Sequence, residues 1–181
     1  MAESAHSARI REWDKLAADS GLPNEMVKLA RKAAHAGDLA QERYWYEKAA
    51  DLGHIDSMGF LAFLAMGEGD EEQAFAMCKR AADYGDAGAM LALGARAQRA
   101  GKFKRARKWY RKAAKRGNTE AMWRSGSLED RAGNTDRARD WFSRAAELNH
   151  TDAMLSLADL EQSSGNTAQA RVWYRRAAGF N

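Results

Sequence analysis

The sequence predicts an all-α protein, an α-solenoid of five 32-residue helical hairpins that follow an N-terminal helix. The first observation is a run of Ala-Ala pairs that recur every 32 residues without slippage, beginning at Ala49, Ala81, Ala113, Ala145 and Ala177. A second is a tryptophan four residues before four of these pairs, at Trp45, Trp109, Trp141 and Trp173, with Trp13 in the same phase before Ala17-Ala18. A fixed period in this range is typical of stacked repeats. Because the tryptophans recur with the period, we interpret them as packing residues between repeats.

The third observation is a pair of glycine series that divides every repeat into two helices. One series is Gly37, Gly69, Gly101, Gly133 and Gly165, and the other is Gly21, Gly53, Gly85 and Gly117, continued by Asn149 and Asn181. Glycine, or asparagine in its place, suits the left-handed position that ends a helix. Two helix ends per 32 residues therefore predict two helices per repeat.

Taken in order, residues 1–22 are expected to hold a helix over about 6–20. The hairpins follow at 23–54, 55–86, 87–118, 119–150 and 151–181. Their first helices are expected at about 23–36, 55–68, 87–100, 119–132 and 151–164, and their second helices at about 38–52, 70–84, 102–116, 134–148 and 166–178. Pro23 suits a first helical position. The expected N-caps are Asp38, Asp70, Asp86, Asn118, Asn134 and Asn166, with His54 and His150 in the same positions.

The repeat also resembles known families. Met90-x2-Leu93-Gly94 followed by Ala106-x3-Tyr110-x2-Ala113 is similar to the tetratricopeptide repeat. The phrase from Ala106 to Gly117, followed by Ala121-Met122, is closer to the Sel1-like repeat, and the resemblance runs from about residue 9 to the end. The chain departs from the Sel1-like pattern in its short turns and from the tetratricopeptide pattern in lacking a proline after the second helix. Either resemblance implies a right-handed superhelix that acts as a non-catalytic interaction scaffold.

If the first helices line the concave surface, as the resemblance implies, one row of that surface is an apolar strip with arginines beside it. Such a composition is typical of the centre of a binding site. We therefore predict a groove for a peptide or partner helix with apolar anchors and some acidic residues. The alternative is that Trp123 and Phe63 fill the concavity against their own neighbours. The predicted groove residues are Val27, Arg31, Phe63, Met66, Leu91, Arg99, Trp123, Arg131 and Leu155.

Charge is distributed unevenly along the repeats. Residues 55–86 hold seven acids and two bases, whereas residues 87–118 hold eleven bases and no acid. Three interpretations remain open: pairing with acids of the neighbouring second helices, an acidic protein partner, and nucleic acid or an anionic surface. Nucleic acid is the least favoured, because no recognition motif accompanies the charge. The basic patch is Lys102, Lys104, Arg105, Arg107, Lys108, Arg111, Lys112, Lys115 and Arg116.

Other functional classes find little support in the sequence. The four histidines are scattered, no metal-ligand spacing or phosphate-binding loop is present, and we expect neither catalysis nor a cofactor. No apolar run is long enough to cross a membrane. A single cysteine and no signal-like start favour the cytoplasm. The last hairpin ends at Gly179-Phe180-Asn181 with no polar capping helix after it. We therefore expect self-association there, as in a homodimer, or further sequence beyond it.

Overall fold

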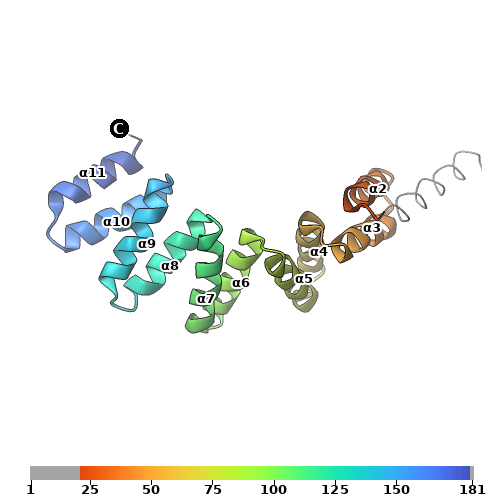
Figure 1. Ribbon diagram of the computed structural model, residues 1–181, viewed down its shortest axis with the longest axis horizontal. Helices are drawn as coiled ribbons and strands as arrows, with labels where there is room; N and C mark the ends of the chain where they lie inside the picture. Colours follow the sequence, from red (N-terminus) through yellow and green to blue (C-terminus); the bar gives the residue numbers. More distant parts are fainter. Residues whose placement is uncertain (1–20, 180–181) are drawn as a thin grey trace, which may run out of the picture. The chain divides into compact units, whose positions relative to one another are not determined.

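A computed structural model describes residues 21–179, and the predicted N-terminal helix over about 6–20 lies outside this range. Within it the chain forms α-helices and no strand (Figure 1). The first helices of the hairpins are α2 (Pro23–His35), α4 (Ile55–Gly67), α6 (Ala87–Arg99), α8 (Thr119–Asp130) and α10 (Thr151–Ser163). The second helices are α3 (Leu39–Asp51), α5 (Glu71–Asp83), α7 (Phe103–Lys115), α9 (Thr135–Glu147) and α11 (Thr167–Ala177).

Each first helix pairs with the second helix that follows it, so the five predicted hairpins are confirmed. All five first helices begin at the predicted residue, and the second helices begin one residue later than predicted because the capping residue itself is not helical. The chain divides into two compact units. Residues up to Tyr84, with α2–α5, form unit 1, and residues from Gly85, with α6–α11, form unit 2.

Helix ends follow the glycine series. After α7, Gly117 has a φ of +84°, and its N–H donates to the carbonyl of Ala114 at 3.0 Å while the next N–H, of Asn118, reaches Ala113 at 3.2 Å. This pair of bonds satisfies carbonyls that the helix leaves open at its end. Asn149 takes the same conformation with a φ of 62°, and no other non-glycine residue in the described range has a positive φ. The substitution of asparagine for glycine is thus confirmed.

Side-chain hydrogen bonds cap most of the predicted helix starts, but not all of them. Side chains of Asp38, Asp70, Asp86, Asn118, His54 and His150 accept a bond from the N–H three residues later. Asn134 and Asn166 occupy the predicted N-cap positions, but their side chains do not make the capping bond. Their amides instead donate to the carboxylates of Glu129, at 2.9 Å, and Glu161, at 2.7 Å. A bond that an amide N–H donates to a charged carboxylate is stronger than one between neutral groups, so these bonds determine how the two asparagine side chains are oriented.

Small residues set the spacing of the two helices in a hairpin. In α6, Gly94 lies against the ring of Tyr110 from α7, and in α8, Gly126 lies against Phe142 from α9. Both rings are buried. The Tyr110 hydroxyl donates to Gln98 at 2.8 Å, and burial raises the pKa of this hydroxyl above its ordinary value. Close approach of the helices therefore depends on the absence of a β-carbon.

Candidate functional site

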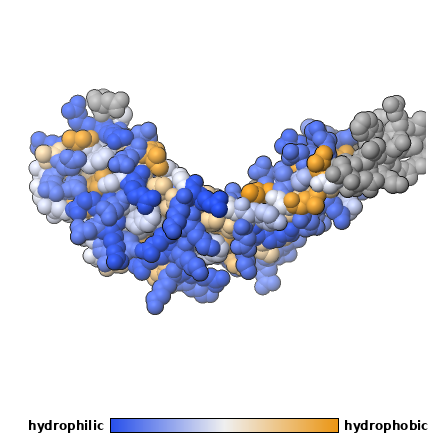
Figure 2. All heavy atoms as spheres, in the orientation of Figure 1, coloured by the Kyte–Doolittle hydropathy of each residue, from blue (hydrophilic) through white to orange (hydrophobic). Residues whose placement is uncertain are grey.

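The surface of α4 in unit 1 is unusually apolar. Met58 and Leu61 point into the core, yet Phe63 and Met66 are 72% and 69% exposed. A helix that is apolar all round is normally buried in a soluble protein. Figure 2 shows one face of the protein, where hydrophilic residues predominate and hydrophobic residues gather in small separate patches. The exposed Phe63–Met66 pair is suited to contact a partner.

Clefts lie between consecutive first helices in both units. In unit 1 a cleft of about 450 Å³ between α2 and α4 includes two predicted groove residues, Val27 and Arg31. In unit 2 a cleft of about 460 Å³ between α8 and α10 includes a third, Arg131. On α6, Leu91 is half-buried and Arg99 is exposed. A single strip that joins these positions across both units remains a prediction.

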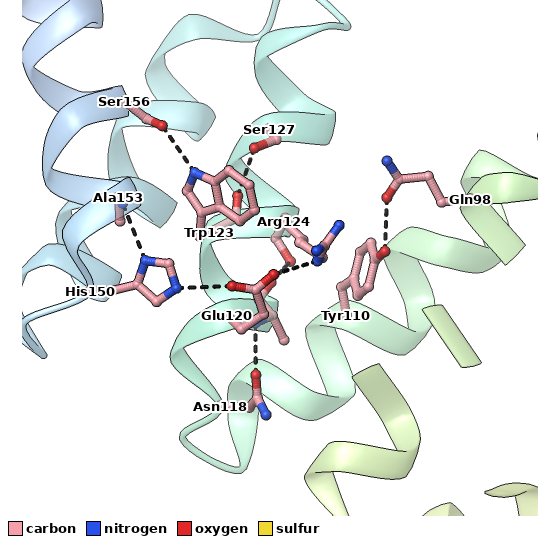
Figure 3. Close-up of polar contacts among 12 residues, drawn as sticks. Gln98, Tyr110, Asn118, Glu120, Trp123, Arg124, Ser127, His150, Ala153 and Ser156 are labelled. Atoms are coloured by element: carbon pink, nitrogen blue, oxygen red, sulfur yellow. Dashed lines mark hydrogen bonds and ion pairs between the residues drawn. The ribbon is translucent and has the colours of Figure 1, made fainter. Parts of the chain in front are cut away.

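Trp123 is already engaged by its own chain. It is half-buried on α8, its indole N–H donates to Ser156 Oγ of α10 at 3.0 Å, and its ring stacks on His150 with 5.9 Å between ring centres (Figure 3). The carboxylate of Glu120 lies between His150 and Arg124, at 3.0 Å and 2.6 Å respectively. These contacts match the alternative in which Trp123 fills space against its neighbours. Leu155, on α10, is 39% exposed.

Only part of the basic patch lines a cleft. A cleft of about 470 Å³ opens between α7 and α9, and the C-terminal part of α8 contributes Glu129 to it. We call this the basic cleft. Three predicted basic residues, Lys102, Arg105 and Arg116, do not line it. Its lining residues are Lys104, Arg107, Lys108, Arg111, Lys112, Lys115, Glu129, Asn134 and Arg137.

A buried carboxylate holds the bottom of the basic cleft. The side chain of Glu129 is only 3% exposed, and its Oε1 lies 3.2 Å from Arg111 Nη2 and 3.6 Å from Arg107 Nε. Asn134 donates to the other oxygen. Arg107 Nε is buried and makes no hydrogen bond, and no other buried side-chain polar atom in the described range is left in that state. We call Arg107, Glu129 and Asn134 an Arg–Glu–Asn cluster.

The same cluster recurs one repeat later. Arg139 Nε lies 2.8 Å from Glu161 Oε1, and Asn166 donates to Oε2 at 2.7 Å. These bonds, that of Asn166 foremost, hold the pKa of the Glu161 carboxyl below its ordinary value. The sequence did not lead us to these clusters, although a signal existed: an arginine, a glutamate 22 residues later and an asparagine five residues after that, twice at the repeat period.

The expected pairing between neighbouring second helices in unit 2 is not found. Asp136 of α9 pairs with Arg139 of its own helix at 3.0 Å rather than with Lys104. Among the described residues, Lys104, Lys108 and Lys115 form no ion pair with acids of α9. The α7 side chains that do pair across a junction are Arg107 and Arg111, which contact Glu129 of α8. Lys112 lies over the ring of Trp109, with its nitrogen 4.6 Å from the ring centre.

The end of unit 2 carries apolar surface. Val172 and Tyr174 of α11 are 55% and 37% exposed, and Trp173 is half-buried. The Tyr174 hydroxyl donates to Asp159 at 2.5 Å. Phe180 lies outside the described range, and self-association through this end remains a prediction.

Residues 21–179 contain no group of acidic, histidine or cysteine side chains arranged to hold a metal ion. In the same range, no helix has the length and hydrophobicity needed to cross a bilayer.

Comparison with known proteins identifies the repeat. A family model described as Sel1 repeat matches residues 43–54, 57–86, 87–118, 119–150 and 151–178. Curated protein sequences yield no match.

Structures of similar fold are helical repeat proteins. A Sel1 repeat protein from Oxalobacter formigenes is 23% identical, with a TM-score of 0.70 over 93% of this chain and 77% of that one. Pseudomonas aeruginosa PilF is 17% identical, with a TM-score of 0.62 over 91% of this chain and 78% of that one. YrrB, described as a TPR protein with an unusual peptide-binding site, is 18% identical, with a TM-score of 0.56 over 97% of this chain and 92% of that one.

Proposed function

The chain belongs to the Sel1 repeat family, and from that premise we propose that it is a non-catalytic scaffold that binds a peptide or partner helix along its first helices. Repeats of this fold typically serve as protein–protein interaction scaffolds. Stacked hairpins present long surfaces of regularly spaced side chains, which suits them to extended partners.

The observation that carries the proposal is the exposure of Phe63 and Met66 on α4. They are three residues apart and therefore lie on one face of the helix. Gly59, one turn before Phe63, has no atom within 4 Å of where its β-carbon would be, so the surface there is open. A partner that covers both side chains would remove their apolar area from water, which favours binding by about 25 cal/mol per Å².

The neighbouring cleft suggests what else the partner carries. Between α2 and α4, Arg31 and Lys28 lie beside Val27 and Phe60. Arginine next to apolar side chains is frequent where binding energy is concentrated. A partner with one or two apolar anchors and a nearby carboxylate fits this combination. YrrB supports the general class, since its description names a peptide-binding site on a similar fold.

Affinity capture with the full chain tests the proposal. Proteins captured by the wild type are compared with those captured by a Phe63→Ser/Met66→Ser variant. A Leu39→Ser variant is the control, because Leu39 is 71% exposed but lies on the second helix α3. We expect the α4 variant to lose specific partners about tenfold or more, the control to retain them, and both to remain folded by circular dichroism. Equal capture by all three proteins would contradict the proposal.

A further inference from the structure

We propose that the basic cleft between α7 and α9 is a second binding site, for an extended acidic segment of a protein partner. It is separate from the first-helix surface of the proposed function, because its walls are second helices of unit 2. Its ligand is recognised through aspartate or glutamate carboxylates rather than through apolar anchors.

The next repeat shows that the lysines of the cleft are not needed for packing. The second Arg–Glu–Asn cluster, around Glu161, joins α9 to α10 with residues equivalent to those that join α7 to α8, although Glu161 accepts its bond from Arg139 and Glu129 accepts its bond from Arg111. On α9, however, the positions equivalent to Lys104, Lys108 and Lys115 are acids. They are Asp136, Asp140 and Glu147. Since the junction forms with either sign of charge on this surface, the lysines are not required for joining the repeats.

The charge of the cleft favours an anionic occupant. Seven cationic side chains line it, and one carboxylate, Glu129, opposes them. Like charges that line one cleft repel one another, and solvent and salt screen that repulsion only in part. A ligand with several carboxylates relieves it. Single exposed ion pairs contribute little, so affinity depends on several contacts made together.

The chemistry of the lining favours a peptide over a nucleic acid. No aromatic residue lines the cleft, and Lys112 covers one face of the nearby Trp109 ring. Single-stranded nucleic acids usually rely on base stacking as well as charge. The arginines at the bottom already bind a carboxylate, that of Glu129, at 3.2 Å from Arg111.

Spacing along α7 matches an extended chain. Lys104, Lys108 and Lys112 are four residues apart, which places them about 6 Å apart along the helix axis. In an extended peptide, side chains on one face recur every second residue, about 6.6 Å apart. An acidic residue at every second position therefore brings each carboxylate beside one lysine. The cleft is expected to prefer this alternating pattern.

The test uses the full chain and a fluorescein-labelled peptide with glutamate and serine in alternation, four glutamates in all. Binding is measured by fluorescence anisotropy at about 50 mM salt and again at higher salt. The cleft variant is Lys104→Asp/Lys108→Asp. The matched control is Lys102→Asp/Arg105→Asp, which changes the net charge by the same amount at the start of the same helix but outside the cleft. A peptide with glutamine for glutamate and a thymidine oligonucleotide complete the set.

We expect affinity for the glutamate peptide to fall with salt, to drop about tenfold or more in the cleft variant, and to drop less than about threefold in the control. The Phe63→Ser/Met66→Ser variant should bind this peptide like the wild type, which separates the inference from the proposed function. Equal loss in both charge variants would overturn it, since net charge alone would explain the binding. So would equal binding of the glutamine peptide, tighter binding of the oligonucleotide, or no binding at low salt.

Discussion

Gly126 lies where α8 packs against α9, and the ring of Phe142 occupies the space that any larger residue would need. A β-carbon at Gly126 would lie 2.5 Å from Phe142 Cε1. Because the ring is buried and cannot move aside, the helices must separate. A Gly126→Ala variant should therefore lose about 1–3 kcal/mol of unfolding free energy, measured by urea denaturation.

Gly59→Ala is the control for this substitution. It is also in a helix interior, but its added β-carbon meets no atom within 4 Å. Alanine restricts the unfolded chain and suits a helix better than glycine, so this variant should gain about 0.5–1 kcal/mol. If the Gly126→Ala variant had the same unfolding free energy as the wild type, α8 and α9 would be able to separate without loss of stability.

Trp123 shows how far a single residue can be interpreted from sequence. Its position outside the repeating tryptophan series identified it as unusual. Its partners could not be predicted, because Ser156 lies 33 residues away and the bond depends on the rotamer of the indole. The exposure of Phe63 was also not predictable, because it depends on whether other parts of the folded chain cover this side chain.

Among the elements, Glu161 joins three helices. Its carboxylate on α10 accepts bonds from Arg139 of α9 and from Asn166, which precedes α11. Its pKa is lowered in the folded protein, so the ionised form adds stability above the ordinary pKa of a glutamate. That stability is lost as the pH falls through the lower, folded pKa.

A Glu161→Gln variant should thus be less stable than the wild type at pH 7, by about 1–3 kcal/mol, because the buried Arg139 contact loses its charge. The difference should shrink as the pH falls below about 4. Urea denaturation at pH 7, 5 and 3 measures it, with Asp140→Asn, at an exposed position, as the control. A difference that stays constant with pH would show that the carboxylate charge is not what stabilises the junction.

Helix boundaries were predictable because the signals that set them are local. Glycine after a helix and a polar cap before it act within a few residues, as at Gly117 and Asn118. Asn134 and Asn166 are the exceptions. Their side chains do not make the capping bond but donate to carboxylates that only tertiary packing buries. Charge pairing across repeats was not predictable for the same reason: whether Lys104 or Arg107 finds an acid depends on side-chain direction, not on repeat phase.

The whole molecule consists of two compact units that differ in how their repeats are joined. Both Arg–Glu–Asn clusters lie in unit 2. At the position of Glu129 and Glu161, α4 carries Ala65 and α6 carries Ala97. In unit 1 the arginine in phase with Arg107, Arg43, pairs instead with Glu68, an exposed residue at the end of α4. In repeat proteins stability is roughly the sum of the repeats and their junctions. The period predicted the solenoid, but not this division, which depends on the strength of individual junctions.

We therefore expect helices α2–α5 to lose amide protection at a lower urea concentration than α6–α11. Hydrogen exchange with mass spectrometry at increasing urea measures this for each peptide. The Glu161→Gln variant supplies the control, because it should bring the transition of unit 2 toward that of unit 1. Simultaneous loss of protection in the wild type would mean that the chain unfolds as one cooperative body.

The repetition of the Arg–Glu–Asn cluster has a consequence for how such chains change in length. In the hairpin 119–150, Glu129 contacts Arg107 of the preceding repeat, and Arg139 contacts Glu161 of the following repeat. A duplicate of these residues placed after the original would meet compatible partners on both sides. Duplication or deletion of a whole hairpin can therefore lengthen or shorten the array while every junction keeps the same type of Arg–Glu–Asn contact.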